Sequence, residues 1–167
     1  GSEGCIFLPY LSGERTPHPD PHARGAFIGL SLRHGMGHMA RAVLEGVSFG
    51  LNDSLTLMRG LGINPSNVIL SGGGTHSQLW KQMLSDIFRF ECSLVNAKEG
   101  AAYGAALLAS VGIKIKNTVQ QASSEWINET EKILPGKDVN IYQRMYSHYQ
   151  NLYPSLKEHF GSMAEIK

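Results

Sequence analysis

The sequence is poor in cysteine, in net charge and in long apolar runs, and each shortage excludes a class of protein. Its two cysteines, Cys5 and Cys92, lie in short apolar segments, which predicts buried free thiols in a reducing compartment rather than a disulfide. A formal net charge of +1 gives no basic surface for nucleic acid or an anionic membrane. No apolar run has membrane-spanning length, and we see no signal peptide at the start. We therefore expect a cytoplasmic protein with neither a nucleic-acid nor a membrane partner.

Patterns of catalytic residues are also scarce. The sequence has no Cys-x-x-Cys pair, no Ser-His-Asp pattern and no clustered pair of carboxylates. The pairs His18/His22 and His34/His38 have a spacing found in zinc sites, but no thiolate accompanies either pair. Asp20 stands beside prolines, where an aspartate is usually a turn former rather than a general base. We predict no metal site and no catalytic residue in this chain.

What the chain does contain is the alternation of an α/β protein. Hydrophobic residues make up 42% of the 167 residues and charged residues 17%, so the chain can bury a core. Apolar runs predict strands at 5–8, 26–30, 68–71 and 92–95. Apolar residues at helical spacing predict helices at 37–59, around Trp80 to Ile87, and at 100–109, 119–134 and 139–153. Strands that alternate with helices favour a sheet with parallel members.

The longest predicted helix carries two unusual residues. Its packing face is predicted to consist of Met39, Val43, Val47 and Leu51, which would cover one sheet that contains the strands at 25–30, 68–71 and 92–95. Gly46 and Gly50 lie one turn apart on this helix. Glycine costs about 1 kcal/mol relative to alanine in an exposed helix, so we expect another backbone to pack closely against this point.

Two further segments allow alternative interpretations. The last helix has an apolar side made of Tyr142, Met145, Tyr146 and Tyr149, which is more typical of core packing than of a ligand cage. Residues 9–21 contain four prolines and are predicted to form a stiff loop. Within that loop Glu14 and Arg15 either form an internal ion pair that braces it or face a partner domain; internal bracing is favoured, because such loops need internal partners.

The most informative stretch is VILSGGGT, residues 68–75, in which a buried strand runs into three glycines and then into a helix. Glycines have no Cβ, so a ligand can lie against the backbone there. Free N–H groups and the positive end of the helix dipole point into the same space, which favours a nucleotide. The turn is neither a Walker A loop, since no Lys-Ser/Thr pair follows, nor G-x-G-x-x-G, since residue 77 is serine. Similar turns also close strand–helix units without a ligand, so both interpretations remain open.

Three stretches together resemble the FGGY carbohydrate kinase family. The first, residues 8–25, contains LSGERTPH, and the second, residues 25–45, ends in HMARAVLE. The third is SGGG at 71–74 with its helix, followed by EGAAYGAA at 99–106. The resemblance implies an α/β fold of the actin-like, ribonuclease H-like ATPase type, with a mixed sheet flanked by helices. Kinases of this family have two domains, of which the N-terminal one binds most of the sugar and the C-terminal one binds ATP.

By this resemblance, residues 1–167 correspond to part of the C-terminal, nucleotide-binding domain, and the N-terminal sugar-binding domain is absent. The family's catalytic aspartate and its phosphate motifs have no counterpart here. Phosphoryl transfer needs those parts and Mg²⁺ on the phosphates, so we expect Mg²⁺ to be bound mainly outside this chain. The chain alone is then expected to be inactive. A homodimer is compatible with the sequence, which leaves the oligomeric state open.

The resemblance also implies which residues meet the adenosine end of ATP. They are Gly72, Gly73, Gly74, Thr75, Ser77 and Gln78. The family often has asparagine where Ser77 stands, so the expected contacts rest more on the glycine backbone than on this side chain.

The loop at residues 12–18 bears on the sugar. With Thr16 followed by Pro17 and His18, it resembles the xylulokinase branch of the family, whereas gluconate kinases more often have alanine at the position of Thr16 and a bulky residue after the proline. The resemblance therefore implies ATP-dependent phosphorylation of D-xylulose to D-xylulose 5-phosphate. Gluconate, another sugar of the family, and a noncatalytic actin-like nucleotide-binding module remain the alternatives.

Overall fold

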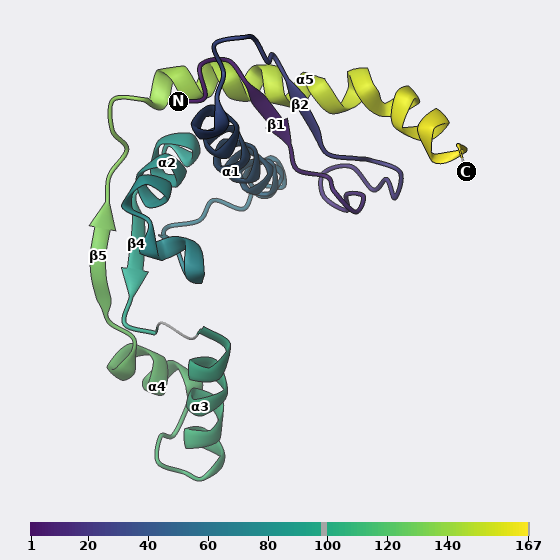
Figure 1. The fold of residues 1–167 in the computed structure, drawn as a ribbon. Coiled ribbons are helices and arrows are strands. Elements are labelled where there is room, and N and C mark those ends of the chain that lie inside the picture. Colours follow the sequence, from purple (N-terminus) through teal and green to yellow (C-terminus); the bar gives the residue numbers. More distant parts are fainter. Residues whose placement is uncertain (98–99, 167) are drawn as a thin grey trace. The chain divides into compact units, whose positions relative to one another are not determined.

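The computed structural model describes residues 1–97 and 100–166. Its elements, in chain order, are β1 (Ile6–Leu8), β2 (Ala26–Ile28), α1 (Met36–Gly60), β3 (Val68–Ile69), a 3-10 turn (Gly73–His76), α2 (Gln78–Phe88), β4 (Cys92–Val95), α3 (Gly100–Gly112), α4 (Val119–Trp126), β5 (Glu129–Ile133) and α5 (Val139–Ala164) (Figure 1). They form two compact units. The first unit contains Gly1–Asn64, Asp86–Phe88 and the chain from Lys137 onward, and the second contains Pro65–Ser85 and Arg89–Gly136.

The first unit is built around a close approach of α1 to β1. β1 pairs antiparallel with β2, with Phe7 opposite Phe27 and their ring centroids 4.6 Å apart. A Cβ placed on Gly46 would lie 2.1 Å from the carbonyl oxygen of Phe7. Glycine is therefore required where the helix meets the strand, and the predicted close packing at Gly46 is confirmed. A small core of Cys5, Phe7 and Ala42 lies at the same place.

The predicted packing face of α1 is only partly correct. Leu51 is 50% exposed, and Met39, Val43 and Val47 are half-buried. The residues of α1 that are buried are Ala42, Glu45, Gly46, Ser48, Phe49, Asn52, Asp53 and Leu55. Polar residues can occupy this face because they have partners elsewhere in the chain: Tyr146 donates a 2.6 Å hydrogen bond to Asp53, and Ser2 Oγ donates one of 2.6 Å to Glu45.

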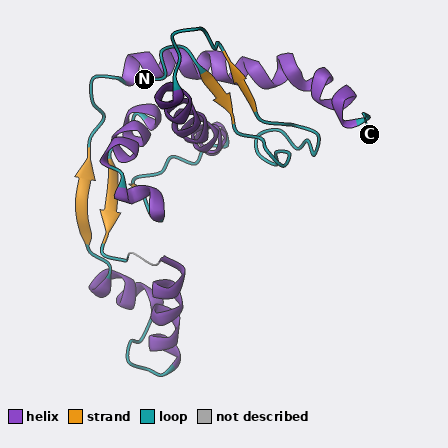
Figure 2. Cartoon of the chain, viewed as in Figure 1, coloured by secondary structure: helices purple, strands orange, loops and turns teal. Residues whose placement is uncertain are grey.

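The helix α5 supplies the aromatic side of this unit, and core packing is confirmed for two of the four residues of its stripe, whereas Met145 and Tyr146 are half-buried. Tyr142 and Tyr149 are buried, and the ring of Phe49 on α1 lies 5.3 Å from that of Tyr149. The helix continues through Pro154 to Ala164, so the predicted end at residue 153 is too early (Figure 2). A proline inside a helix removes one hydrogen bond without always ending it.

The second unit contains a mixed three-stranded sheet. β3 and β4 are parallel, and β5 is antiparallel to β4. The helix α2 is tied to β5 by Lys81, whose ammonium lies 2.6 Å from Glu131, and by Ser85, which donates to the carbonyl of Ile133. The mixed sheet is as predicted, but the prediction that residues 25–30 share it is wrong, because β2 pairs with β1 in a separate sheet.

The segment predicted as one helix over residues 119–134 is instead α4 followed by β5. Ile127 leaves the helical conformation with φ −93° and ψ 115°. Asn96 and Asn128 then exchange hydrogen bonds, since the N–H of Asn96 donates to the carbonyl of Asn128 and the N–H of Asn128 to the side chain of Asn96. These bonds lie just ahead of β5 and help to set its pairing with β4.

The two cysteines are free and buried, as the sequence predicts. Burial raises the pKa of both thiols, that of Cys92 to about 11. None of the described helices is both long enough and apolar enough to cross a membrane.

Candidate functional site

The three glycines that follow β3 have three different surroundings. Gly72 has a φ of 89°, in the left-handed region that favours glycine. A Cβ on Gly74 would lie 2.9 Å from the ring of Trp80. Around Gly73 no heavy atom lies within 4 Å of such a Cβ, and its φ is not positive. The fold therefore explains Gly72 and Gly74, whereas the space beside Gly73 is open.

Hydrogen bonds hold this turn in one conformation. The N–H of Thr75 donates to the carbonyl of Gly72 at 3.1 Å, its hydroxyl donates to the same oxygen at 2.7 Å, and the N–H of Ser77 donates to Gly74 at 3.1 Å. Within residues 1–97 and 100–166, no hydrogen bond uses the N–H groups of Gly73 and Gly74. Two backbone donors therefore remain for a ligand beside the open space.

The polar side chains predicted for the site lie in the same turn but have partners within the protein. Ser77 begins α2 as its N-cap, with its hydroxyl accepting from the N–H of Trp80 at 3.2 Å. The amide of Gln78 donates to Glu131 at 3.3 Å. The structure thus brings the predicted residues together. Their polar side chains already have hydrogen-bond partners within the protein, whereas two N–H groups of the glycine backbone have none among the described residues. Glu99, in the last stretch of the resemblance, lies outside the described residues.

We predict that Ser77 contributes to stability as a helix cap. Ser77→Ala is expected to lower the free energy of unfolding by about 1 kcal/mol, because it removes the acceptor for the N–H of Trp80. Ser77→Asn keeps a capping oxygen and should lose much less. Urea denaturation followed by circular dichroism measures both. Equal stability losses in the two variants would show that the cap is not what Ser77 contributes.

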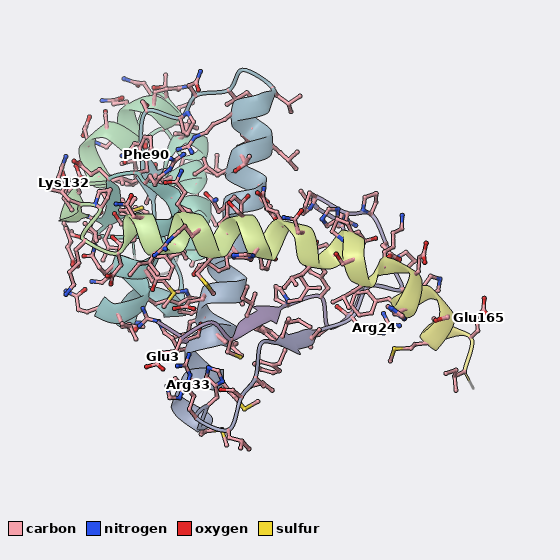
Figure 3. The ribbon with its side chains drawn as sticks, turned by 90° about the horizontal axis from the view of Figure 1, so that it is seen from above. Glu3, Arg24, Arg33, Phe90, Lys132 and Glu165 are labelled. Carbon is pink, nitrogen blue, oxygen red and sulfur yellow. The ribbon has the colours of Figure 1, made fainter. Side chains whose placement is uncertain are left out.

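The rings of His34 and His38 accept hydrogen bonds from backbone N–H groups of nearby turns. In the described part of the chain, no three side chains of His, Cys, Asp or Glu are grouped so that they could hold a metal ion. Nδ1 of His34 accepts from the N–H of Ser31 at 2.8 Å, and Nδ1 of His38 accepts from the N–H of Gly35 at 3.1 Å. Glu3 and Arg33 form an exposed ion pair of 3.8 Å nearby (Figure 3).

The proline-rich loop is braced internally. The carboxylate of Glu14 accepts from the backbone N–H groups of Arg15 and Thr16 at 2.6 and 2.9 Å. Internal bracing is therefore confirmed. The carboxylate of Glu14 is held by the backbone N–H of Arg15, however, and not by the expected ion pair with the Arg15 guanidinium.

Asp20 has the turn geometry predicted for it. Its Oδ1 accepts from the N–H of His22 at 2.8 Å, and its Oδ2 accepts from the hydroxyl of Tyr153 on α5 at 2.7 Å. These hydrogen bonds, the one from Tyr153 first, lower the pKa of its carboxyl. The loop is thus tied to α5 through a carboxylate that stays ionised.

Comparison with known proteins gives matches over most of the chain. Residues 2–113 match the C-terminal domain of the FGGY family of carbohydrate kinases. A xylulose kinase from Staphylococcus epidermidis is 37% identical over 95% of this chain and 32% of its own length. The crystal structures of a ligand-bound xylulose kinase and of a gluconate kinase, both from Lactobacillus acidophilus, superpose with TM-scores of 0.87 and 0.84. Each is 29% identical to this chain, and each match covers 98% of this chain and 33% of the length of the solved kinase chain. The chain therefore spans about a third of the length of the relatives it matches.

Proposed function

The chain belongs to the FGGY family of carbohydrate kinases, and from that membership we propose that it contributes the adenosine end of the ATP site in an enzyme that phosphorylates D-xylulose to D-xylulose 5-phosphate. The actin-like ATPase fold of this family is shared by the solved structures that the chain superposes on. The observation that carries the proposal is the turn after β3. There, two unused N–H groups border open space beside Gly73.

In this proposal the residues of the turn have separate tasks. Gly72 sets the bend, while Gly73 and Gly74 offer backbone to the adenine and ribose. Thr75, Ser77 and Gln78 hold the turn and the start of α2, so the site is rigid before the ligand arrives. A rigid site loses less conformational entropy on binding. The chain's contribution to the reaction is thus binding and orientation.

Mg²⁺ and the base that accepts the proton of the sugar hydroxyl are proposed to come from the N-terminal domain and the phosphate motifs of the longer kinase. When bound, Mg²⁺ neutralises charge on the phosphates. The described residues offer no cluster that fits such an ion. The residues of this chain that we assign to the site accordingly serve adenosine binding alone, either as contacts or by holding the turn.

D-Xylulose is favoured as the sugar by two observations. The 37% identical relative is a xylulose kinase, and the loop carries Thr16 and His18, as in the xylulokinase branch. Gluconate is the second candidate because the gluconate kinase structure matches with the same 29% identity and almost the same TM-score. In both cases the sugar itself is proposed to bind mainly to the N-terminal domain.

We predict that the kinase containing this chain uses D-xylulose in preference to gluconate. Its kcat/KM is expected to be at least about 100-fold higher for D-xylulose, since a site that hydrogen-bonds one substrate leaves polar groups unpaired with another. A coupled assay of ADP formation with each sugar measures this. The 167-residue chain alone should form no ADP with either.

Two results would contradict this proposal. A higher kcat/KM for gluconate would mean that gluconate, and not D-xylulose, is the substrate, and it would leave the proposed role of the turn unchanged. ADP formation by the 167-residue chain itself would mean that a catalytic carboxylate lies within it, at Asp20, Asp53 or Asp86.

A further inference from the structure

The first unit contains a cavity of about 210 Å³ between α1, α5 and the proline-rich loop. The residues that matter for its chemistry are Tyr10, His18, Asp53, Thr56, Tyr146 and Tyr149. None of them belongs to the glycine turn, and only His18 supports the function proposed above, through its place in the loop that bears on the sugar. The cavity is roughly the size of a small organic molecule, and four of the residues that line it carry aromatic rings.

Asp53 is the carboxylate among the residues that line this cavity. Asp53 is only 6% exposed, and its Oδ1 accepts a 2.6 Å hydrogen bond from Tyr146. Within the described residues, no hydrogen bond joins Oδ2 to the protein. Every fully enclosed side-chain oxygen or nitrogen there has a partner, so Oδ2 is not fully enclosed. Asp53 lines the cavity and its Oδ1 already accepts from Tyr146, so Oδ2 is the oxygen left for a ligand. Burial raises the pKa of this carboxyl, against the hydrogen bond from Tyr146, which lowers it, and the charge of Glu14 adds a smaller rise.

The surroundings of Asp53 favour a positive ligand. Among residues 1–97 and 100–166, no lysine or arginine lines the cavity. Burial lowers the pKa of His18, whose ring stacks on Tyr153 with centroids 4.0 Å apart, so that imidazole stays neutral near pH 7. The rings of Tyr146 and Tyr149 lie stacked at 6.3 Å between centroids. An aromatic face attracts a cation, and a partly desolvated carboxylate attracts it more strongly than one in water.

We propose that this cavity binds a small organic ammonium ion, with the charged nitrogen on Asp53 Oδ2 and the apolar body against the tyrosine rings. A single ammonium group matches the single available carboxylate oxygen, and an alkyl body of a few carbons suits the apolar remainder of the wall. The hydroxyl of Tyr146 fixes the carboxylate in place, so binding needs no rearrangement of α1. The site is separate from the adenosine turn and does not require kinase activity.

The test is a titration of the 167-residue chain with n-butylammonium chloride and, separately, with 1-butanol. These two probes have the same chain length and differ in charge. Backbone amide shifts in the ¹H–¹⁵N spectrum should move at Asp53, Tyr146 and Tyr149 with the ammonium ion. 1-Butanol should bind at least about tenfold more weakly, because it lacks the charge-assisted hydrogen bond. Equal affinity for the two probes would overturn the proposal.

Variants distinguish binding of the ammonium ion in this cavity from nonspecific attraction to charges on the protein surface. Asp53→Asn keeps an acceptor for Tyr146 and should weaken n-butylammonium binding at least about tenfold. Glu158→Gln removes one charge from an exposed position of α5 and should leave binding unchanged. If Asp53→Asn fails to fold, Leu57→Trp decides instead. Leu57 lines the cavity and is 45% exposed, so tryptophan there should fill the space and abolish binding. Undiminished binding in either folded variant, or a loss with Glu158→Gln equal to that with Asp53→Asn, would rule out this site.

Discussion

Replacing Gly46 by valine is expected to lower the free energy of unfolding of the first unit by more than about 3 kcal/mol, at the upper end of what overpacking costs. The Cβ of the new side chain would lie 2.1 Å from the carbonyl oxygen of Phe7 and 3.0 Å from its carbonyl carbon. Both atoms belong to the backbone of β1, so no side-chain rotation relieves the clash. Either α1 or β1 must move, and the small core of Cys5, Phe7 and Ala42 opens with it.

A matched control exists in the same helix. No heavy atom lies within 4 Å of a Cβ placed on Gly37. Gly37→Ala should therefore stabilise the protein by about 0.5–1 kcal/mol, because alanine loses less backbone entropy on forming a helix. Urea denaturation followed by circular dichroism measures both variants. If Gly46→Val unfolded at the same urea concentration as the wild type, α1 and β1 would not be packed as the structure shows.

This pair of glycines shows what a sequence can reveal about packing. Gly46 interrupts a strong helical pattern, and such an interruption predicts close backbone contact. The sequence alone does not say which backbone approaches, because β1 lies about forty residues away. Similarly, the buried face of α1 is displaced from the apolar stripe that the pattern indicates. Asp53 can be buried there because Tyr146 donates to it from α5, and Glu45 because Ser2 and Tyr142 donate to it.

The errors over residues 119–134 and in the sheet have a related cause. The strand β5, with the sequence ETEKI, is rich in residues that are uncommon in strands. It becomes a strand because β4 offers pairing partners and Lys81 offers a charge for Glu131. The sheet itself was misjudged because strand patterns do not specify which strands pair. The order strand, glycine turn, helix was predicted correctly because it depends on consecutive local residues, but the strand is not buried as expected, since Ile69 in β3 is 52% exposed.

Gly73→Val in the longer kinase is expected to raise the KM for ATP about tenfold or more and to leave the KM for the sugar little changed. The space beside Gly73 is open in the protein, so under the proposed function the valine would occupy the place of the adenosine. A steric conflict of about 1–3 kcal/mol corresponds to about a 5- to 150-fold loss of affinity. The sugar, which is proposed to bind elsewhere, should be unaffected.

The same substitution at the neighbouring glycines provides control variants for this experiment. Gly72→Val strains a backbone whose φ is 89°, and Gly74→Val meets the ring of Trp80 at 2.9 Å. Both variants should therefore lose stability, by about 1–3 kcal/mol for the strained backbone, and should affect both substrates through loss of folded protein. Gly73→Val meets neither obstacle, so its thermal unfolding should stay close to that of the wild type.

The decisive comparison is between folding and ATP affinity in the same Gly73→Val sample. A thermal melt establishes the folded fraction, and separate titrations with ATP and with D-xylulose then measure each affinity on folded protein. Weak ATP binding with normal xylulose binding assigns the open space to the nucleotide. A well-folded variant with unchanged ATP affinity would mean that the three glycines only shape the connection from β3 to α2. The unused N–H groups of Gly73 and Gly74 would then face solvent rather than adenosine, and the adenosine end of the site would have to be sought in other residues.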